Sequence, residues 1–182
     1  MRPVFLIGFM GCGKTTLGVE LARAMHCRFV DLDDYIELLH GATVSELFAT
    51  RGEAWFRGQE QEALRSVAAG NDVVVACGGG TPCGPGAMEL MNERGLTVWL
   101  TTSAQRIAAR LCLPEQKAKR PLLAGKSDDE MLAYVERTLS ARTPFYAQAR
   151  LRFDSTDIET AAATRATARR LSATLYAASA TP

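Results

Sequence analysis

The sequence carries almost no net charge, because 21 basic residues are balanced by 20 acidic ones over 182 residues, which gives a formal charge of +1. A protein that binds nucleic acid non-specifically normally carries a basic surplus, so no nucleic-acid partner is expected. Any anion must therefore be held locally, by a few placed residues. The hydrophobic fraction of 47% and the charged fraction of 23% exclude a largely disordered or a fibrous chain.

Long apolar runs are also absent. None reaches the roughly 20 residues that cross a bilayer, so no membrane partner is expected. The apolar run 4–7 is too short for the core of a signal peptide before it reaches Gly8, which favours a cytoplasmic protein. The five cysteines include no pair with CxxC spacing. Neither a zinc site nor a redox pair is predicted, and reduced thiols fit the cytoplasm.

Short apolar runs alternate with segments of helical periodicity. Strands are expected at 4–7, 29–30, 73–75, 96–100 and 151–153, and helices at 14–25, 34–39, 53–69, 86–93, 104–113 and 158–176. Capping boxes at 43–46 and 127–130 mark two further helix starts. This alternation predicts one α/β domain over residues 1–182, with a five-stranded parallel sheet and helices on both faces. The basic, proline-containing stretch 114–126 is the best candidate for a mobile segment.

A glycine-rich segment follows the first expected strand. Residues 8–15, Gly-Phe-Met-Gly-Cys-Gly-Lys-Thr, fit the P-loop pattern G-x-x-x-x-G-K-[ST]. The glycines let backbone N–H groups point at a phosphate, and the helix that follows adds its positive end. Lys14 is expected to reach the β- and γ-phosphates, and the Thr15 hydroxyl to join a magnesium shell. The residues expected to bind the nucleotide here are Gly11, Cys12, Gly13, Lys14, Thr15 and Thr16.

Cys12 of this loop has two readings. A helix N-terminus lowers a thiol pKa, so Cys12 is either a reactive thiol beside the phosphates or a small residue that fills the loop.

Carboxylates follow the second expected strand, at Asp31, Asp33 and Asp34. The strand at 73–75 leads instead to the glycine triplet 78–80, which offers close backbone approach but no negative charge. In an extended segment, Asp31 and Asp33 share one side. One of them is expected to serve a metal ion and the other a hydroxyl nucleophile. The alternative is that Asp33 or Asp34 only caps the next helix.

Taken in this order, these blocks resemble the shikimate kinase family of small P-loop kinases, which have the nucleoside-monophosphate-kinase-like fold. The resemblance covers about residues 4–155. It rests on the P-loop, Asp31-Leu32-Asp33, Phe56-Arg57, the glycine triplet, Arg120-Pro121-Leu122-Leu123 and Arg142-Thr143-Pro144-Phe145-Tyr146. It implies transfer of the γ-phosphate of ATP to the 3-hydroxyl of shikimate, with magnesium and a mobile lid at about 114–126. That reaction is a step of chorismate and aromatic amino acid biosynthesis.

The resemblance implies roles on the acceptor side of the site. Asp31 would hold a magnesium-bound water beside the metal ligand Thr15, and Asp33 would bind and orient the reacting hydroxyl. Two arginines, Arg57 and Arg142, would clamp the shikimate carboxylate, since a planar guanidinium matches a carboxylate bidentately. The backbone of Gly79 and Gly80 would contact the ring substituents.

On the nucleotide side, the resemblance implies that Arg120 comes from the lid to meet the transferring phosphates. Phosphoryl transfer needs mainly positioning and neutralisation of oxygen charge, which Lys14, Arg120 and magnesium supply. The segment 154–157 lacks the arginine that often flanks adenine in this family. Arg110, near the end of its helix, is the candidate to stack on the base.

Two other functions remain open at this point. A similar kinase, such as a gluconate kinase, would also have a P-loop and a lid, but the Asp31/Asp33 pair and the glycine triplet favour a compact cyclic polyol acid. A nucleotide-binding regulatory module would need no second anion site, whereas the two substrate arginines predict one. The sequence shows no obvious exposed apolar stripe, so a monomer is expected.

Overall fold

The parallel sheet is present in the computed structural model, which describes residues 1–118 and 123–179. Its strands are β1 (Val4–Ile7), β2 (Arg28–Asp31), β3 (Val73–Ala76), β4 (Leu96–Thr101) and β5 (Leu151–Asp154). All neighbouring pairs are parallel, in the order β2-β3-β1-β4-β5. The predicted five-stranded parallel sheet is therefore confirmed.

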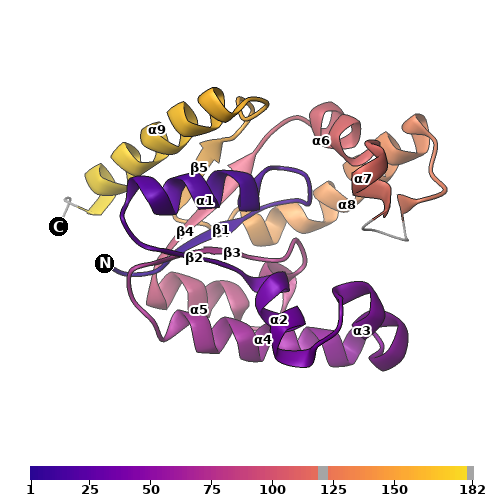
Figure 1. The fold of residues 1–182 in the computed structure, drawn as a ribbon, viewed down its shortest axis with the longest axis horizontal. Coiled ribbons are helices and arrows are strands. Elements are labelled where there is room, and N and C mark those ends of the chain that lie inside the picture. The colour runs from indigo at the N-terminus through magenta and orange to yellow at the C-terminus, as the bar shows by residue number, and fades with distance from the viewer. Residues whose placement is uncertain (119–122, 180–182) are drawn as a thin grey trace.

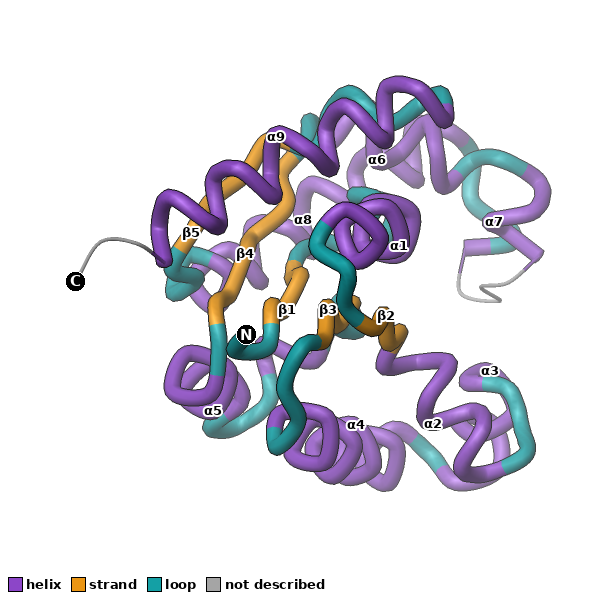
Figure 2. The backbone as a smooth tube through the Cα atoms, turned by 60° about the vertical axis from the view of Figure 1, so that its left-hand side comes forward, coloured by secondary structure: helices purple, strands orange, loops and turns teal. Residues whose placement is uncertain are grey.

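Helices cover both faces of the sheet, as predicted. They are α1 (Lys14–Ala24), α2 (Leu32–His40), α3 (Val44–Arg51), α4 (Glu53–Ala68), α5 (Ala87–Arg94), α6 (Ala104–Leu111), α7 (Pro114–Ala118), α8 (Asp128–Tyr146) and α9 (Ala161–Ser179), with a 3-10 turn at Thr81–Cys83. Helices α1 and α9 lie on one face, and α4 and α5 on the other (Figures 1 and 2). Both predicted capping boxes form, at the starts of α3 and α8. No helix in the two described ranges is long and apolar enough to span a bilayer.

Strand β1 shows why the core has two halves. Val4 and Leu6 pack into an apolar cluster with α1 and α9, whereas Phe5 and Ile7 pack into a second cluster with α4 and α5. All four side chains are fully buried, which explains the unbroken apolar run in the sequence. The sheet is thus fixed between two helical layers, and the loops at its carboxyl edge are left to bind ligands.

The carboxylate segment differs from the sequence expectation. Helix α2 begins at Leu32, so Asp33 lies in its first turn and not in an extended segment. Asp31 is the N-cap, and its side chain accepts the N–H of Asp33 at 3.1 Å. The predictions that Asp31 and Asp33 share one side of an extended segment, and that Asp33 or Asp34 caps the helix, are therefore wrong. Aspartate is a favoured N-cap, and with Asp31 in that position the buried Leu32 is the first residue of the helix.

The expected lid lies only partly within the described residues. Helix α7 forms at the start of the stretch that was expected to be mobile, and its first residue, Pro114, suits a first helical turn. Leu123 is buried in a third cluster with side chains of α6 and α8. Arg120 lies outside the described residues, so its contact with the transferring phosphates stays a prediction.

Candidate functional site

Three predicted segments meet at the carboxyl edge of the sheet. Strands β1, β2 and β3 are parallel neighbours, so the P-loop, Asp31 and the glycine triplet all follow strands that end at this edge. Ligands of open parallel sheets bind where the chain leaves such strand ends in opposite directions. The structure therefore gathers the sequence candidates into one region.

The P-loop has the backbone that its glycines predict. Gly13 has a φ of +95°, and a Cβ there would lie 2.0 Å from Cδ1 of Ile158, so no other residue fits without a shift. Lys14 folds back over the loop, and its Nζ donates to the carbonyl oxygens of Gly8 at 2.9 Å and Phe9 at 3.0 Å. The first N–H groups of α1 have no intrahelical acceptor, which leaves them for an anion. The loop thus combines a cation with a helix N-terminus.

Cys12 is held within this loop rather than exposed on it. Its side chain is 1% exposed and packs against the α1–α9 side of the core. The Ser155 hydroxyl donates to the carbonyl oxygen of Cys12 at 2.9 Å. Of the two readings, burial favours the small loop-filling residue. Thr16, by contrast, is exposed on the first turn of α1.

Two hard oxygen atoms lie side by side next to Lys14. The Thr15 hydroxyl donates to Oδ2 of Asp31 at 2.7 Å. The other Asp31 oxygen is fixed as the N-cap of α2, so this pair is positioned by the ends of two helices. Carboxylate and hydroxyl oxygens are the ligands that magnesium prefers. The donor set therefore fits a magnesium ion shared with a phosphate bound in the loop.

Asp33 is a largely buried carboxylate at the same edge. Burial, together with the negative charges of Asp31 and Glu60, raises its pKa from 3.8 to about 6, while Lys14 acts in the opposite direction. A Cβ on Gly78 would lie 3.0 Å from Oδ1 of Asp33, so the glycine triplet leaves room for this carboxylate. A buried acid with a raised pKa, next to a phosphate-binding loop, is a candidate to hold or accept a proton.

The buried charge of Asp33 is expected to cost stability. Its folded pKa of about 6 lies above the ordinary value of 3.8, so folding disfavours the ionised form. Since one pKa unit corresponds to about 1.4 kcal/mol, Asp33→Asn should raise the free energy of unfolding by about 1–3 kcal/mol above pH 6. The gain should vanish below about pH 4, where the carboxyl group is protonated in both states. Thermal unfolding across this range measures it, and equal stability at neutral pH would contradict the account.

Glu60, which the sequence analysis did not single out, fixes the orientation of the Arg57 side chain. Glu60 is 2% exposed, and its Oε1 accepts the Thr81 hydroxyl at 2.7 Å. Arg57 donates through Nη1 to Glu60 and through Nε and Nη2 to Glu53, at 3.3 and 3.0 Å. Glu60 lies one helical turn after Arg57 on α4, and this Arg-x-x-Glu spacing was the available signal. The guanidinium is therefore oriented from one side by a buried carboxylate.

Arg142 reaches the same region from α8. Its guanidinium lies 5.6 Å from the ring centre of Phe9, and its Nη1 is buried with no acceptor anywhere in the described chain. Four residues later, the buried Tyr146 donates its hydroxyl to the carbonyl oxygen of Gly79 at 2.6 Å, which fixes the glycine triplet against α8. A buried, unpaired arginine nitrogen indicates that an anionic ligand belongs there.

The glycine triplet is where these charged side chains approach the backbone. A Cβ on Gly79 would lie 3.2 Å from Nη1 of Arg142, and one on Gly80 would lie 2.8 Å from Nη1 of Arg57. The adjacent cavity has a volume of about 330 Å³, and both arginines and Glu60 line it. That volume suits a small molecule. The two arginines favour an anionic ligand there, and Glu60 holds Arg57 in place beside it.

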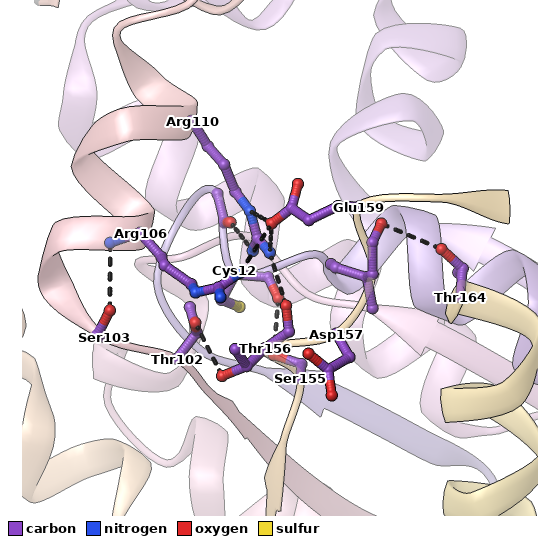
Figure 3. A network of polar contacts seen from close by, with 12 residues as sticks. Cys12, Thr102, Ser103, Arg106, Arg110, Ser155, Thr156, Asp157, Glu159 and Thr164 are labelled. Carbon is purple, nitrogen blue, oxygen red and sulfur yellow. Dashed lines mark hydrogen bonds and ion pairs between the residues drawn. The ribbon is translucent and has the colours of Figure 1, made fainter. Parts of the chain in front are cut away.

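Arg110 contacts the P-loop through its guanidinium. It extends from α6 and donates to the carbonyl oxygens of Gly11 at 2.9 Å and Thr156 at 3.2 Å (Figure 3). A third partner is Glu159, 2.6 Å from Nη2. Arg110 is thus tied to the P-loop and to the segment between β5 and α9, although the sequence suggested neither contact.

Comparison with known proteins identifies close relatives. A sequence profile described as shikimate kinase matches residues 10–174. A shikimate kinase of Parabacteroides distasonis is 46% identical over 155 residues, 85% of this chain and 88% of that protein. The crystal structure of a shikimate kinase from Bacteroides thetaiotaomicron superposes with a TM-score of 0.91 at 42% identity, over 96% of this chain and 98% of that one. A shikimate kinase from Acinetobacter baumannii, in complex with shikimate, gives 0.84 at 28% identity over 100% and 96%.

The alternative kinase type shares only the fold. A gluconokinase from Sinorhizobium meliloti superposes with a TM-score of 0.51 at 16% identity, over 98% of this chain and 97% of that one. This similarity reaches the P-loop kinase architecture and carries no argument about the acceptor.

Proposed function

The chain belongs to the shikimate kinase family, and we propose from the geometry of its site how it transfers the γ-phosphate of ATP to the 3-hydroxyl of shikimate. The observation that carries the proposal is the buried, unpaired Nη1 of Arg142 beside the cavity that Arg57 also lines. A regulatory module that only binds nucleotide has no use for this second anion site.

The two arginines hold the acid end of shikimate. The carboxylate lies between Arg142 and Arg57, where planar guanidinium groups match its two oxygens. Glu60 keeps Arg57 pointed into the cavity, while the more exposed Glu53 gives way to the substrate carboxylate at the outer nitrogens. The clamp fixes the ring, so the 3-hydroxyl is presented at the carboxyl edge of the sheet.

Asp33 orients the reacting hydroxyl. Its carboxylate accepts the hydrogen bond of the 3-hydroxyl and receives the proton as the new phosphate ester forms. A pKa of about 6 keeps Asp33 largely ionised at neutral pH yet basic enough to take a proton. A loose phosphoryl-transfer transition state needs little help from a base, so orientation is the larger part of this role.

The P-loop side holds ATP. Lys14 leaves the carbonyl oxygens of the loop for the β- and γ-phosphates, and Arg120 joins them from the lid. Thr15 would bind magnesium directly, and Asp31 would hold it through a water molecule. The metal would supply positive charge that neutralises the phosphate oxygens during transfer. Arg110 presents its guanidinium to the adenine. We place the enzyme in the cytoplasm, where its five free cysteines would stay reduced, and we propose that it is a monomer.

The clamp makes a direct prediction for shikimate affinity. Arg142→Ala or Arg57→Ala removes a charge-assisted hydrogen bond and should raise the KM for shikimate about 10- to 150-fold, with little change for ATP. Steady-state kinetics with each substrate varied in turn measures the split. Arg94→Ala, which removes an exposed arginine of α5, serves as the control. A larger effect on ATP than on shikimate would show that the clamp is misassigned.

A further inference from the structure

We propose that Glu159 is a positioning residue for the nucleotide side of the site. It fixes the orientation of the Arg110 guanidinium, which links the P-loop to the segment between β5 and α9. The consequence depends on the proposed function, in which Arg110 faces the adenine of ATP. The contact itself stands on the structure alone.

Three residues, Glu159, Gly11 and Thr156, accept hydrogen bonds from the one guanidinium of Arg110, and we call this arrangement the Arg110 bracket. Oε1 of Glu159 accepts from Nε of Arg110 at 3.2 Å and from Nη2 at 2.6 Å. The remaining bonds of Arg110 go to two backbone carbonyls, Gly11 through Nη1 at 2.9 Å and Thr156 through Nη2 at 3.2 Å. The Arg110 side chain is 16% exposed, and the same Glu159 oxygen lies 3.5 Å from Nη1 of Arg106. Figure 3 shows Glu159 as the acid on which the two arginines converge.

This bracket decides which part of Arg110 is available. The four hydrogen bonds use four of the five N–H groups of the guanidinium, and these groups point outward in its plane. With most of its edge occupied, Arg110 acts on a ligand mainly through its flat face, which suits stacking on a base. It is poorly placed to donate to phosphates. Glu159 thus makes Arg110 a base platform rather than another phosphate-binding cation.

The direction in which ATP binding changes when Glu159 is neutralised separates a positioning role from a purely electrostatic one. ATP is a polyanion, so removing one negative charge near its site should strengthen binding if only the long-range field matters. Freeing Arg110 to reach the phosphates would act in the same direction. If Glu159 works by holding Arg110 as a platform, its loss should instead weaken ATP binding.

Glu159→Gln tests this with little change in shape. The KM for ATP should rise about 2- to 10-fold, the size expected when a partly exposed charge pair is lost, while the KM for shikimate stays unchanged. Asp157→Asn is the matched control, since it removes one charge from the same segment and the Asp157 carboxylate points away from Arg110 in Figure 3. It should leave the KM for ATP unchanged or lower it slightly. A KM for ATP that is unchanged or lower in Glu159→Gln would overturn the proposal.

A second set of measurements tests two claims separately: that Glu159 orients Arg110, and that Arg110 contacts the adenine. In the ligand-free protein, the Arg110 Nε–H should exchange slowly with solvent by NMR, and Glu159→Gln should accelerate it. Arg110→Ala should raise the KM for ATP, and adding Glu159→Gln to it should raise that KM no further. If Arg110→Ala leaves the KM for ATP unaltered, the adenine role of Arg110 fails as well. If Arg110→Ala raises it but Glu159→Gln does not, only the present inference fails.

Discussion

Lys14→Met is expected to abolish phosphoryl transfer, with kcat/KM lowered by about 10²–10³-fold or more, because a placed cation at the transferring phosphates is lost. The fold should survive the change. The Lys14 ammonium contacts the loop carbonyls of Gly8 and Phe9 and lies outside the apolar clusters, so methionine leaves the core packing intact. Coupled measurement of ADP release gives the rate, and thermal unfolding monitors the fold.

The same variant should also shift the pH profile. Burial, Asp31 and Glu60 raise the pKa of Asp33 to about 6, and Lys14 is the group that opposes them. Without Lys14, the pKa of Asp33 should rise further, so residual activity should be lost at a higher pH as acidity increases. Near-normal turnover of a folded Lys14→Met protein would rule out the phosphate role.

Asp33→Asn is expected to lower kcat about 10²–10⁴-fold, the range for a positioned acid–base group. Asparagine keeps the shape but neither accepts the hydroxyl proton nor holds the nucleophile in the same way. The magnesium requirement should change little, because the Thr15–Asp31 oxygen pair is left intact. Together with the higher stability expected for this variant, the loss of activity would show that the buried charge serves the reaction and not the fold.

Asp31→Asn is the matched comparison, since it makes the same chemical change two residues away. It should raise the apparent magnesium requirement, because it removes the charged member of the oxygen pair. Titrating both variants with magnesium at saturating ATP and shikimate divides the roles. If Asp33→Asn shifted the requirement and Asp31→Asn did not, the two assignments would be reversed.

The sheet and the P-loop were predictable because their signals are local. The buried strand 4–7, the glycines and the lysine of the loop lie within about a dozen consecutive residues. The place of Asp33 was not predictable by the same means. Alternation of side chains assumes an extended chain, whereas Asp31 is the N-cap of a helix that begins at Leu32. Local patterns thus predicted the P-loop but not the backbone geometry of the carboxylate segment.

Contacts between distant segments account for the rest. Tyr146 holds the carbonyl of Gly79 across 67 positions of the chain, and Glu159 meets Arg110 across 49. No local pattern predicts either contact, because the two partners of each lie in different elements that only the tertiary structure brings together. The contact of Glu60 with Arg57 was partly predictable, since their spacing is visible in the sequence but the burial of Glu60 is not.

The most direct test of the account is the acceptor requirement of the purified protein. ADP release should be measured with ATP and magnesium in three parallel reactions, with shikimate, with gluconate and with no acceptor. The clamp of Arg57 and Arg142 predicts rapid release with shikimate alone and only background release in the other two. Equal release with gluconate, or release that shikimate does not stimulate, would contradict the assignment of the cavity as a shikimate site.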